Sequence, residues 1–136
     1  MDNMDRYFTL GEAEALLPRI TPLLEDIQRL RAEYVAAEEQ FEALQEKLQG
    51  NGHVSQPKAQ QARETMAHAA RDIQHAVAEI AELGVLVKDL ETGLVDFPAQ
   101  RQGREVYLCW RLGEEGIGWW HPTDTGVAGR QPMDTF

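Results

Sequence analysis

The chain has 136 residues, 43% of them hydrophobic, which predicts one folded domain over residues 1–136 with a core that needs no disulfides or metals. Its formal net charge of −10 argues against nucleic-acid and membrane-surface partners, because phosphate backbones and lipid headgroups are themselves anionic and no basic patch breaks the acidic surface. No apolar run approaches the ~20 residues that cross a bilayer.

A heptad pattern fills the first part of the chain. Its apolar positions alternate spacings of four and three: Leu16, Ile20, Leu23, Ile27, Leu30, Tyr34, Ala37, Phe41, Leu44 and Leu48. This spacing predicts a coiled-coil seam on a long helix. Thr9 and Glu12 have capping-box spacing, so the helix should begin near Leu10. Pro18 and Pro22 lack the amide proton of a helix interior and predict a kink or a break, and the unbroken phase of the seam favours the kink.

Turn-forming residues over 50–57 precede a second helical pattern. Its members have smaller side chains: Ala62, Met66, Ala69, Ile73, Ala76, Ile80 and Leu83. Gly84 is a natural helix stop, because the left-handed cap conformation suits glycine. Residues 1–83 are therefore expected to form a long antiparallel helical hairpin.

Apolar residues beside the seam suggest self-association. They are Leu17, Leu24, Val35 and Val77. A lone hairpin buries one stripe on each helix, so these flanks need another surface to cover them. We expect a homodimer that forms a four-helix arrangement.

Beyond Gly84 the apolar period changes to two, which is typical of strands. The alternating runs are Val95 and Phe97, then Val106, Leu108, Trp110 and Leu112, then Ile117, Trp119 and His121. Turn-forming segments at 100–103 and 113–116 separate them. Residues 84–121 are thus predicted to form a three-stranded antiparallel β-meander, which makes the fold class α+β. Residues 85–88 fit a short edge strand or a last helical turn, and residues 122–136 are expected to form an irregular arm.

Two tight turns set the expected register. A turn at 114–115 places Leu112 opposite Ile117, Trp110 opposite Trp119 and Leu108 opposite His121. A turn at 101–102 places Phe97 opposite Val106 and Asp96 opposite Tyr107. One face of the meander should then cover the helix ends. The other face holds Leu94, Asp96, Tyr107, Cys109, Arg111 and Trp120, and His121 is not among them.

His121 and Asp124 suggest a site for a divalent transition metal, because imidazole and carboxylate groups three residues apart suit a metal of intermediate hardness. Two ligands do not make a site, so Asp89, Glu91 or Asp96 would have to complete it. The alternative is that His121 packs under the tryptophans and donates a hydrogen bond to a backbone carbonyl.

A wider ligand site is also conceivable around the meander. Its candidate residues are Asp89, Asp96, Cys109, Arg111 and Arg130. An ion pair on a sheet face explains Asp96 and Arg111 without a ligand, and an unpaired cysteine such as Cys109 more often packs than reacts. On the second helix, a row at helical spacing offers either a metal site or a solvated flank. That row is Glu64, His68, Asp72, His75 and Glu79.

The sequence supports two hypotheses about function and does not decide whether the protein is an enzyme. The first is a homo-oligomeric interaction or structural module with a possible protein partner. The alternative is a metal- or small-ligand-binding protein, with a hydrolase as one form of it, and with its site near His121 and Asp124. A single cysteine and a first segment without a cationic start or apolar run lead us to expect a cytoplasmic protein.

The run GVLVKDLETGLVDFP, continued by GREVYLCWRLGEEGIGWWHPTDTGVAGRQP, resembles a bacterial family known as domain of unknown function 2203, as does the opening FTLGEAEALLP. The resemblance covers nearly the whole chain. It implies a helical hairpin followed by a small strand segment, and it implies no activity, cofactor or substrate. Pro122 stands where the resemblance leads us to expect an acidic residue. The matching positions are Lys88, Asp89, Gly93, Asp96, Pro98, Cys109, Trp110, Glu114, Trp120, His121, Gly129 and Arg130.

Overall fold

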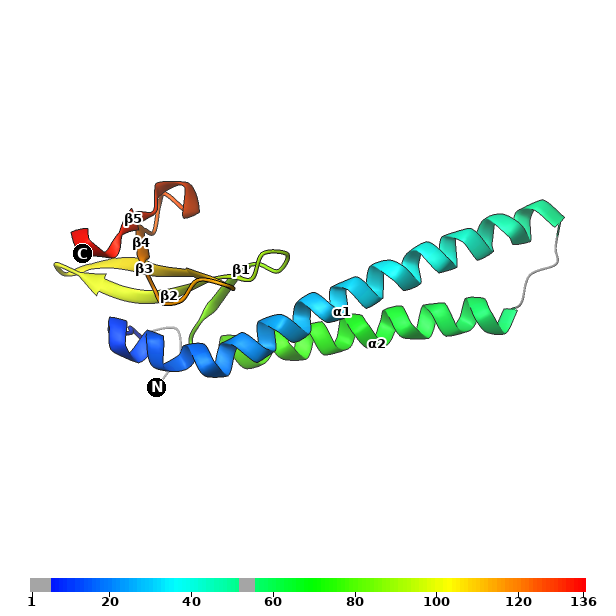
Figure 1. Ribbon diagram of the computed structural model, residues 1–136, viewed down its shortest axis with the longest axis horizontal. Helices are drawn as coiled ribbons and strands as arrows, with labels where there is room; N and C mark the ends of the chain where they lie inside the picture. The colour runs from blue at the N-terminus through cyan, green and yellow to red at the C-terminus, as the bar shows by residue number, and fades with distance from the viewer. Residues whose placement is uncertain (1–5, 52–55) are drawn as a thin grey trace. The chain divides into compact units, whose positions relative to one another are not determined.

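The computed structural model describes residues 6–51 and 56–136, which form two compact units. We call residues 6–25 and 77–136 the sheet unit, and the described part of residues 26–76 the hairpin unit (Figure 1). Two helices pack together and an antiparallel sheet follows them, as the sequence predicted. Within the described residues, neither helix has a segment both long and apolar enough to cross a membrane.

The first helix, α1, covers Leu10–Asn51, and its start confirms the capping box. The Glu12 amide donates to the Thr9 hydroxyl at 3.1 Å, and the Thr9 amide donates to the Glu12 carboxylate at 2.9 Å. The prolines do not break the helix, in line with the alternative that the seam favoured, since Pro18 and Pro22 both lie inside this one helix. Both prolines are exposed, so the carbonyls that lose their amide partners can turn towards water.

The second helix, α2, covers Gln56–Glu82, and Gly84 follows it with a φ of 89°. Residues 52–55 of the predicted turn lie outside the described residues. Inside the hairpin unit, α1 buries Ile27, Leu30 and Ala37. The buried residues of α2 there are all alanines: Ala59, Ala62, Ala69 and Ala76. Larger side chains on one helix thus face smaller ones on the other, as the two patterns predicted.

The sheet has five antiparallel strands in the order β1-β2-β3-β4-β5, and not the three that we predicted. They are β1 (Leu86–Asp89), β2 (Leu94–Arg101), β3 (Arg104–Arg111), β4 (Trp119–Pro122) and β5 (Gln131–Pro132). The two additional strands are the short edge strands: β1 matches the edge-strand alternative offered for residues 85–88, and β5 lies in the arm, where no strand was expected. The arm expected over 122–136 is more regular than predicted, because it contains β5 and two 3-10 helices, Val127–Gly129 and Met133–Thr135.

Both predicted turns differ from the structure. The first turn is one residue further on, at 102–103, so Phe97 pairs with Leu108 and Asp96 with Cys109. The second connection is a loop over 112–118 in place of a two-residue turn, and it pairs His121 with Tyr107. The first change shifts the register by two residues and keeps every side chain on its predicted face. The second shifts it by one residue and moves His121 to the opposite face.

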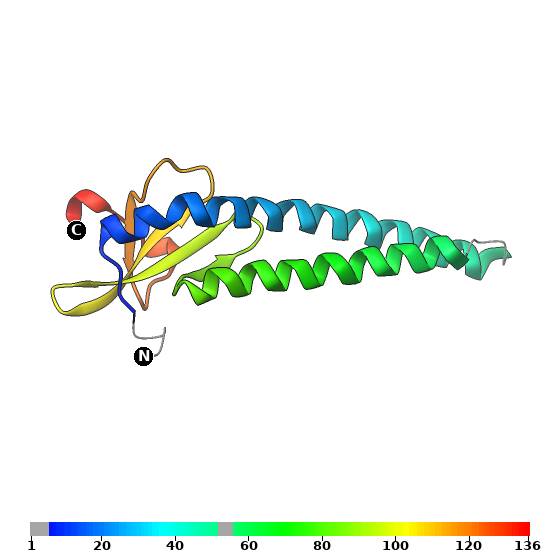
Figure 2. The same cartoon turned by 90° about the horizontal axis from the view of Figure 1, so that it is seen from below.

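One face of the sheet, the core face, forms most of the core of the sheet unit. Val95, Phe97 and Leu108 on this face are fully buried, and the Phe8 ring contacts Phe97 edge-on with ring centroids 5.5 Å apart. The first turns of α1 lie against this part of the sheet in both views (Figures 1 and 2). Leu17 and Leu24, which we expected on a dimer surface, are buried within the chain. The sheet unit therefore covers part of the apolar flank from which the homodimer was predicted.

Candidate functional site

Three potential metal ligands converge on the other face of the sheet, the site face. Asp96 lies on β2, Cys109 on β3 directly opposite it, and His121 on β4. A carboxylate oxygen, the thiol sulfur and an imidazole nitrogen all lie within 4.8 Å of one another. All three residues are buried. Three neighbouring strands thus bring one oxygen, one sulfur and one nitrogen ligand to a single point, which the predicted register had excluded.

Both ring nitrogens of His121 have a partner. Nδ1 lies 2.8 Å from the backbone carbonyl oxygen of Pro122, which can only accept, so Nδ1 carries a proton and donates it. This is the hydrogen bond that the packing hypothesis expected. Nε2 lies 3.1 Å from Oδ2 of Asp96, and each of these side chains is only 3% exposed. In the neutral imidazole, Nε2 therefore presents its lone pair to the carboxyl group.

Asp96 occupies an environment that disfavours an isolated negative charge. Burial raises the pKa of the Asp96 carboxyl above its ordinary value, although the charge and hydrogen bond of His121, the charge of Lys88 and the Cys109 thiol all act to lower it. Its second oxygen, Oδ1, is buried and has no hydrogen-bond partner among the described residues. A buried acceptor without a partner costs about 1–3 kcal/mol, so this atom calls for a bound cation or donor.

Cys109 is fully buried and reduced. Burial, together with the charge of Asp96, raises the pKa of the Cys109 thiol to about 11, although Arg130 and Arg111 act in the opposite direction. A thiol of this kind is a poor nucleophile at neutral pH, which argues against the catalytic hypothesis for Cys109.

We expect Cys109 in the native, metal-free protein to react with a water-soluble disulfide reagent at least 100-fold more slowly than in the unfolded chain. Burial keeps the reagent away from the sulfur, and the raised pKa keeps the thiol protonated, so little reactive thiolate is available. Following the released chromophore at pH 8 with and without denaturant measures the ratio. Equal rates in the two states would contradict the buried placement.

Asp96 and His121 also line a cavity of about 390 Å³ on the site face. Arg111, a predicted ligand residue, lines the same cavity, as do Lys88 and Tyr107. Segment 123–127, from the predicted arm, contributes Thr123, Gly126 and Val127 to its wall. Four predicted site residues thus line this cavity, Asp89, Asp96, Arg111 and His121, while Cys109 is not part of its wall.

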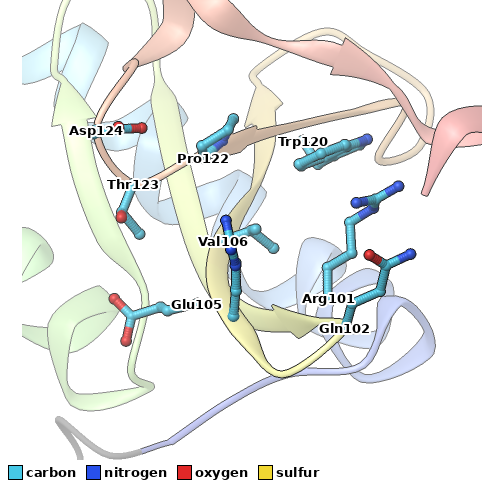
Figure 3. Close-up of a pocket in the computed structure, with 9 residues that line it drawn as sticks. Arg101, Gln102, Glu105, Val106, Trp120, Pro122, Thr123 and Asp124 are labelled. Atoms are coloured by element: carbon cyan, nitrogen blue, oxygen red, sulfur yellow. The ribbon is translucent and has the colours of Figure 1, made fainter.

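Asp124 lies elsewhere. It is exposed and lines a second cavity, of about 710 Å³, opposite Arg101 and Gln102 (Figure 3). Two charged groups of that cavity already have partners: the guanidinium of Arg101 lies 4.7 Å from the Trp120 ring and donates to a backbone carbonyl, and Glu105 accepts from the Tyr7 hydroxyl. Asp124 is not part of the convergent triad, so the predicted pair of His121 and Asp124 is replaced by His121, Asp96 and Cys109.

Two other predicted site residues, Asp89 and Arg130, form contacts outside the triad of Asp96, Cys109 and His121. Asp89 accepts hydrogen bonds from the amides of Glu91 and Thr92 and from the Thr92 hydroxyl, which closes the loop between β1 and β2. Arg130 pairs with Glu114 at 3.0 Å and stacks over Trp119. Among the described residues, the histidine and carboxylate row on α2 gives no convergent group of three ligands.

Sequence reasoning missed two contributions. Lys88 was named only as part of the family resemblance, and the arm was not expected to wall a cavity. Cys109 and His121 were not expected to share a site, because the tight turn that we predicted placed their side chains on opposite faces of the sheet. One signal in the sequence indicated a loop in place of a tight turn, namely Gly113 and Gly116 with Glu114 between them. In the structure the Glu114 carboxylate accepts a hydrogen bond from the Arg111 amide at 2.7 Å.

Comparison with known proteins gives a family and no activity. No curated protein and no solved structure matches the chain. A family model matches residues 6–133, nearly the whole length, and confirms the resemblance seen in the sequence. The chain belongs to the family described as "Uncharacterized conserved protein (DUF2203)".

Proposed function

We propose that this protein binds a divalent transition metal ion, with zinc as the best fit, through Asp96, Cys109 and His121. The observation that carries the proposal is the convergence of three different ligand atoms within 4.8 Å in a buried place. Zinc accepts sulfur, nitrogen and oxygen ligands together, whereas calcium and magnesium prefer oxygen alone.

The imidazole is arranged as in known metal sites. A ligating histidine usually donates its other ring N–H to a carbonyl or carboxylate, which fixes the tautomer and the ring orientation. Here Nδ1 donates to Pro122 and leaves Nε2 directed at Asp96. In a tetrahedral zinc site, nitrogen and oxygen ligands lie about 3.3 Å apart, close to the 3.1 Å between Nε2 and Oδ2.

The charges also fit. A carboxylate and a thiolate together neutralise a divalent cation, so the metal-loaded site would have no net charge to bury. A structural pair between His121 and Asp96 explains their hydrogen bond but leaves Oδ1 without a partner. An ion bound by the carboxylate would remove that cost.

The geometry argues against a metal-free hydrolase. A histidine that acts as general base needs one ring nitrogen oriented by a partner and the other free to reach a substrate. Both nitrogens of His121 are already engaged. With three protein ligands, the ion would keep a fourth position for water or for a ligand from the adjoining cavity.

Cobalt(II) titration of the reduced, chelator-treated full chain tests the proposal, because cobalt substitutes for zinc and absorbs visible light. We expect one equivalent to bind, with d–d bands of a tetrahedral site and a near-ultraviolet thiolate charge-transfer band. Cys109→Ser should lose the charge-transfer band, and zinc should displace the cobalt. The control His68→Ala, which changes an exposed residue of α2, should match the wild type.

Two results would overturn the metal proposal. One is the absence of stoichiometric cobalt binding in a wild-type chain that circular dichroism shows to be folded. The other is a Cys109→Ser spectrum identical to that of the wild type. Cys109→Ser changes one atom in the core, so it is the variant least expected to unfold.

Self-association is a second candidate function, and Val35 is the observation that favours it. This side chain is 47% exposed on the heptad-patterned part of α1. We expect light scattering to give the mass of a dimer at micromolar concentration, and Val35→Glu to shift the population towards monomer because the carboxylate would be desolvated in the interface. A wild-type monomer at that concentration would contradict the dimer. The protein partner and the cytoplasmic location stay predictions.

A further inference from the structure

The cavity on the site face contains two cations without ionic partners. Lys88 and Arg111 line it, and neither forms an ion pair among the described residues. The Nε atom of Arg111 is buried without a hydrogen-bond partner. The Lys88 ammonium lies 5.5 Å from the centroid of the Tyr107 ring. Both cations line the same cavity, so an anion that enters it would meet two positive charges that no carboxylate in the described part of the chain neutralises.

The carboxylates of the same cavity form no ion pair with Lys88 or Arg111. Asp89 uses both oxygens to close its own loop, and Asp96 uses Oδ2 to pair with His121. These acids therefore leave Lys88 and Arg111 available to an anion. Guanidinium groups bind carboxylates well, because two parallel N–H groups match two oxygens.

Apolar side chains form much of the remaining wall. Leu94 of β2 is buried, and Tyr107 of β3 lines the same cavity further along the sheet. Val127 is 38% exposed and is one of five large apolar side chains that are exposed in the described part of the chain. Because Val127 lines the cavity, a ligand with an apolar body would cover it.

We propose that this cavity binds a small organic acid, with the carboxylate held by Arg111 and Lys88 and an apolar body against Leu94, Tyr107 and Val127. A volume of about 390 Å³ suits a ligand of one ring or a short aliphatic chain. Inorganic phosphate offers the charge without the apolar body and is therefore expected to bind more weakly. The proposal goes beyond the metal site, since the residues that hold the acid are not metal ligands.

Isothermal titration calorimetry on the full chain tests this with benzoate and hexanoate against their neutral amides. We expect the acids to bind with dissociation constants on the order of 1 mM or below, as for ligands of under ten heavy atoms, and the amides at least 10-fold more weakly. Arg111→Gln should weaken acid binding about 10-fold, and Lys88→Gln should weaken it less. The control Arg104→Gln, exposed and outside this cavity, should have no effect.

Three outcomes would overturn the proposal: no binding of either acid, equal binding of acid and amide, or binding of phosphate as tight as that of the acids. Circular dichroism of Arg111→Gln and Lys88→Gln checks that they fold. Each titration is run with and without zinc. Acid binding in a protein that takes up no metal would leave this proposal standing while the metal proposal fails, so the two can be separated.

Discussion

Replacing Phe97 with alanine is expected to lower the free energy of unfolding of the sheet unit by about 3–5 kcal/mol. Phe97 is fully buried in the middle of β2, between β1 and β3. Its ring meets Phe8 at an interplanar angle of 85°, which adds an aromatic contact to the burial. The Phe8 amide also donates to the Pro98 carbonyl at 2.7 Å, so the segment before α1 depends on the same strand.

Denaturant unfolding followed by tryptophan fluorescence measures this loss. All three tryptophans lie in the sheet unit with Phe97, so their signal reports that unit even if the hairpin unit unfolds separately. Phe136→Ala is the matched control. Phe136 is 41% exposed, and its ring centroid lies 5.7 Å from that of Trp120, so the loss should stay below about 1.5 kcal/mol. Similar losses in the two variants would contradict the central place of Phe97 in the core.

The helices were predictable because their signals are local. The capping box of Thr9 and Glu12 forms as the spacing indicated, and Gly84 adopts the left-handed conformation expected after a helix. Pro18 and Pro22 left a break open as an alternative, and the unbroken phase of the seam correctly favoured one continuous helix. Among the heptad positions whose burial the structure describes, Ile20, Ile27, Leu30 and Ala37 are buried and the others are half-buried, and the pattern could not show that the sheet unit would bury Leu17 and Leu24.

The sheet was harder to predict, because register depends on loop length and not on the strands themselves. Asp96 and Cys109 were placed on one face correctly, since an error of two residues preserves the alternation of faces. His121 was placed on the wrong face by an error of one residue. The loop over 112–118 is longer than the predicted turn because distant groups hold it: the Ile117 amide donates to Glu14 of α1 at 3.2 Å. No local pattern encodes that contact.

The shift of one residue in the register between β3 and β4 decides which residues form the candidate site. With His121 on the predicted face, the nearest acid in sequence was Asp124, and Cys109 was excluded. The observed register removes Asp124 and completes a set of three different ligands. The cavity beside them depends on the arm after Pro122, whose short β5 and 3-10 helices have no periodic signal.

Zinc is expected to stabilise the wild-type protein against unfolding, because the folded chain binds the ion and the unfolded chain does not assemble the site. At a free zinc concentration 100 times the dissociation constant, linkage gives about 2.7 kcal/mol. For a unit of the size of the sheet unit, the midpoint of thermal unfolding should rise by about 10–20 °C. A chelator should reverse the rise. Melts followed by tryptophan fluorescence in the presence and absence of zinc measure it.

The variants locate the effect. His121→Ala removes one ligand and leaves Asp96 without its partner, so this variant should melt lower without zinc and gain almost nothing from adding it. Cys109→Ser should keep most of the metal-free stability and lose most of the zinc response. His68→Ala removes an exposed histidine from the α2 row and should respond as the wild type does. Equal zinc responses in all four proteins would mean that the ion binds outside Asp96, Cys109 and His121, and the metal proposal would then be wrong.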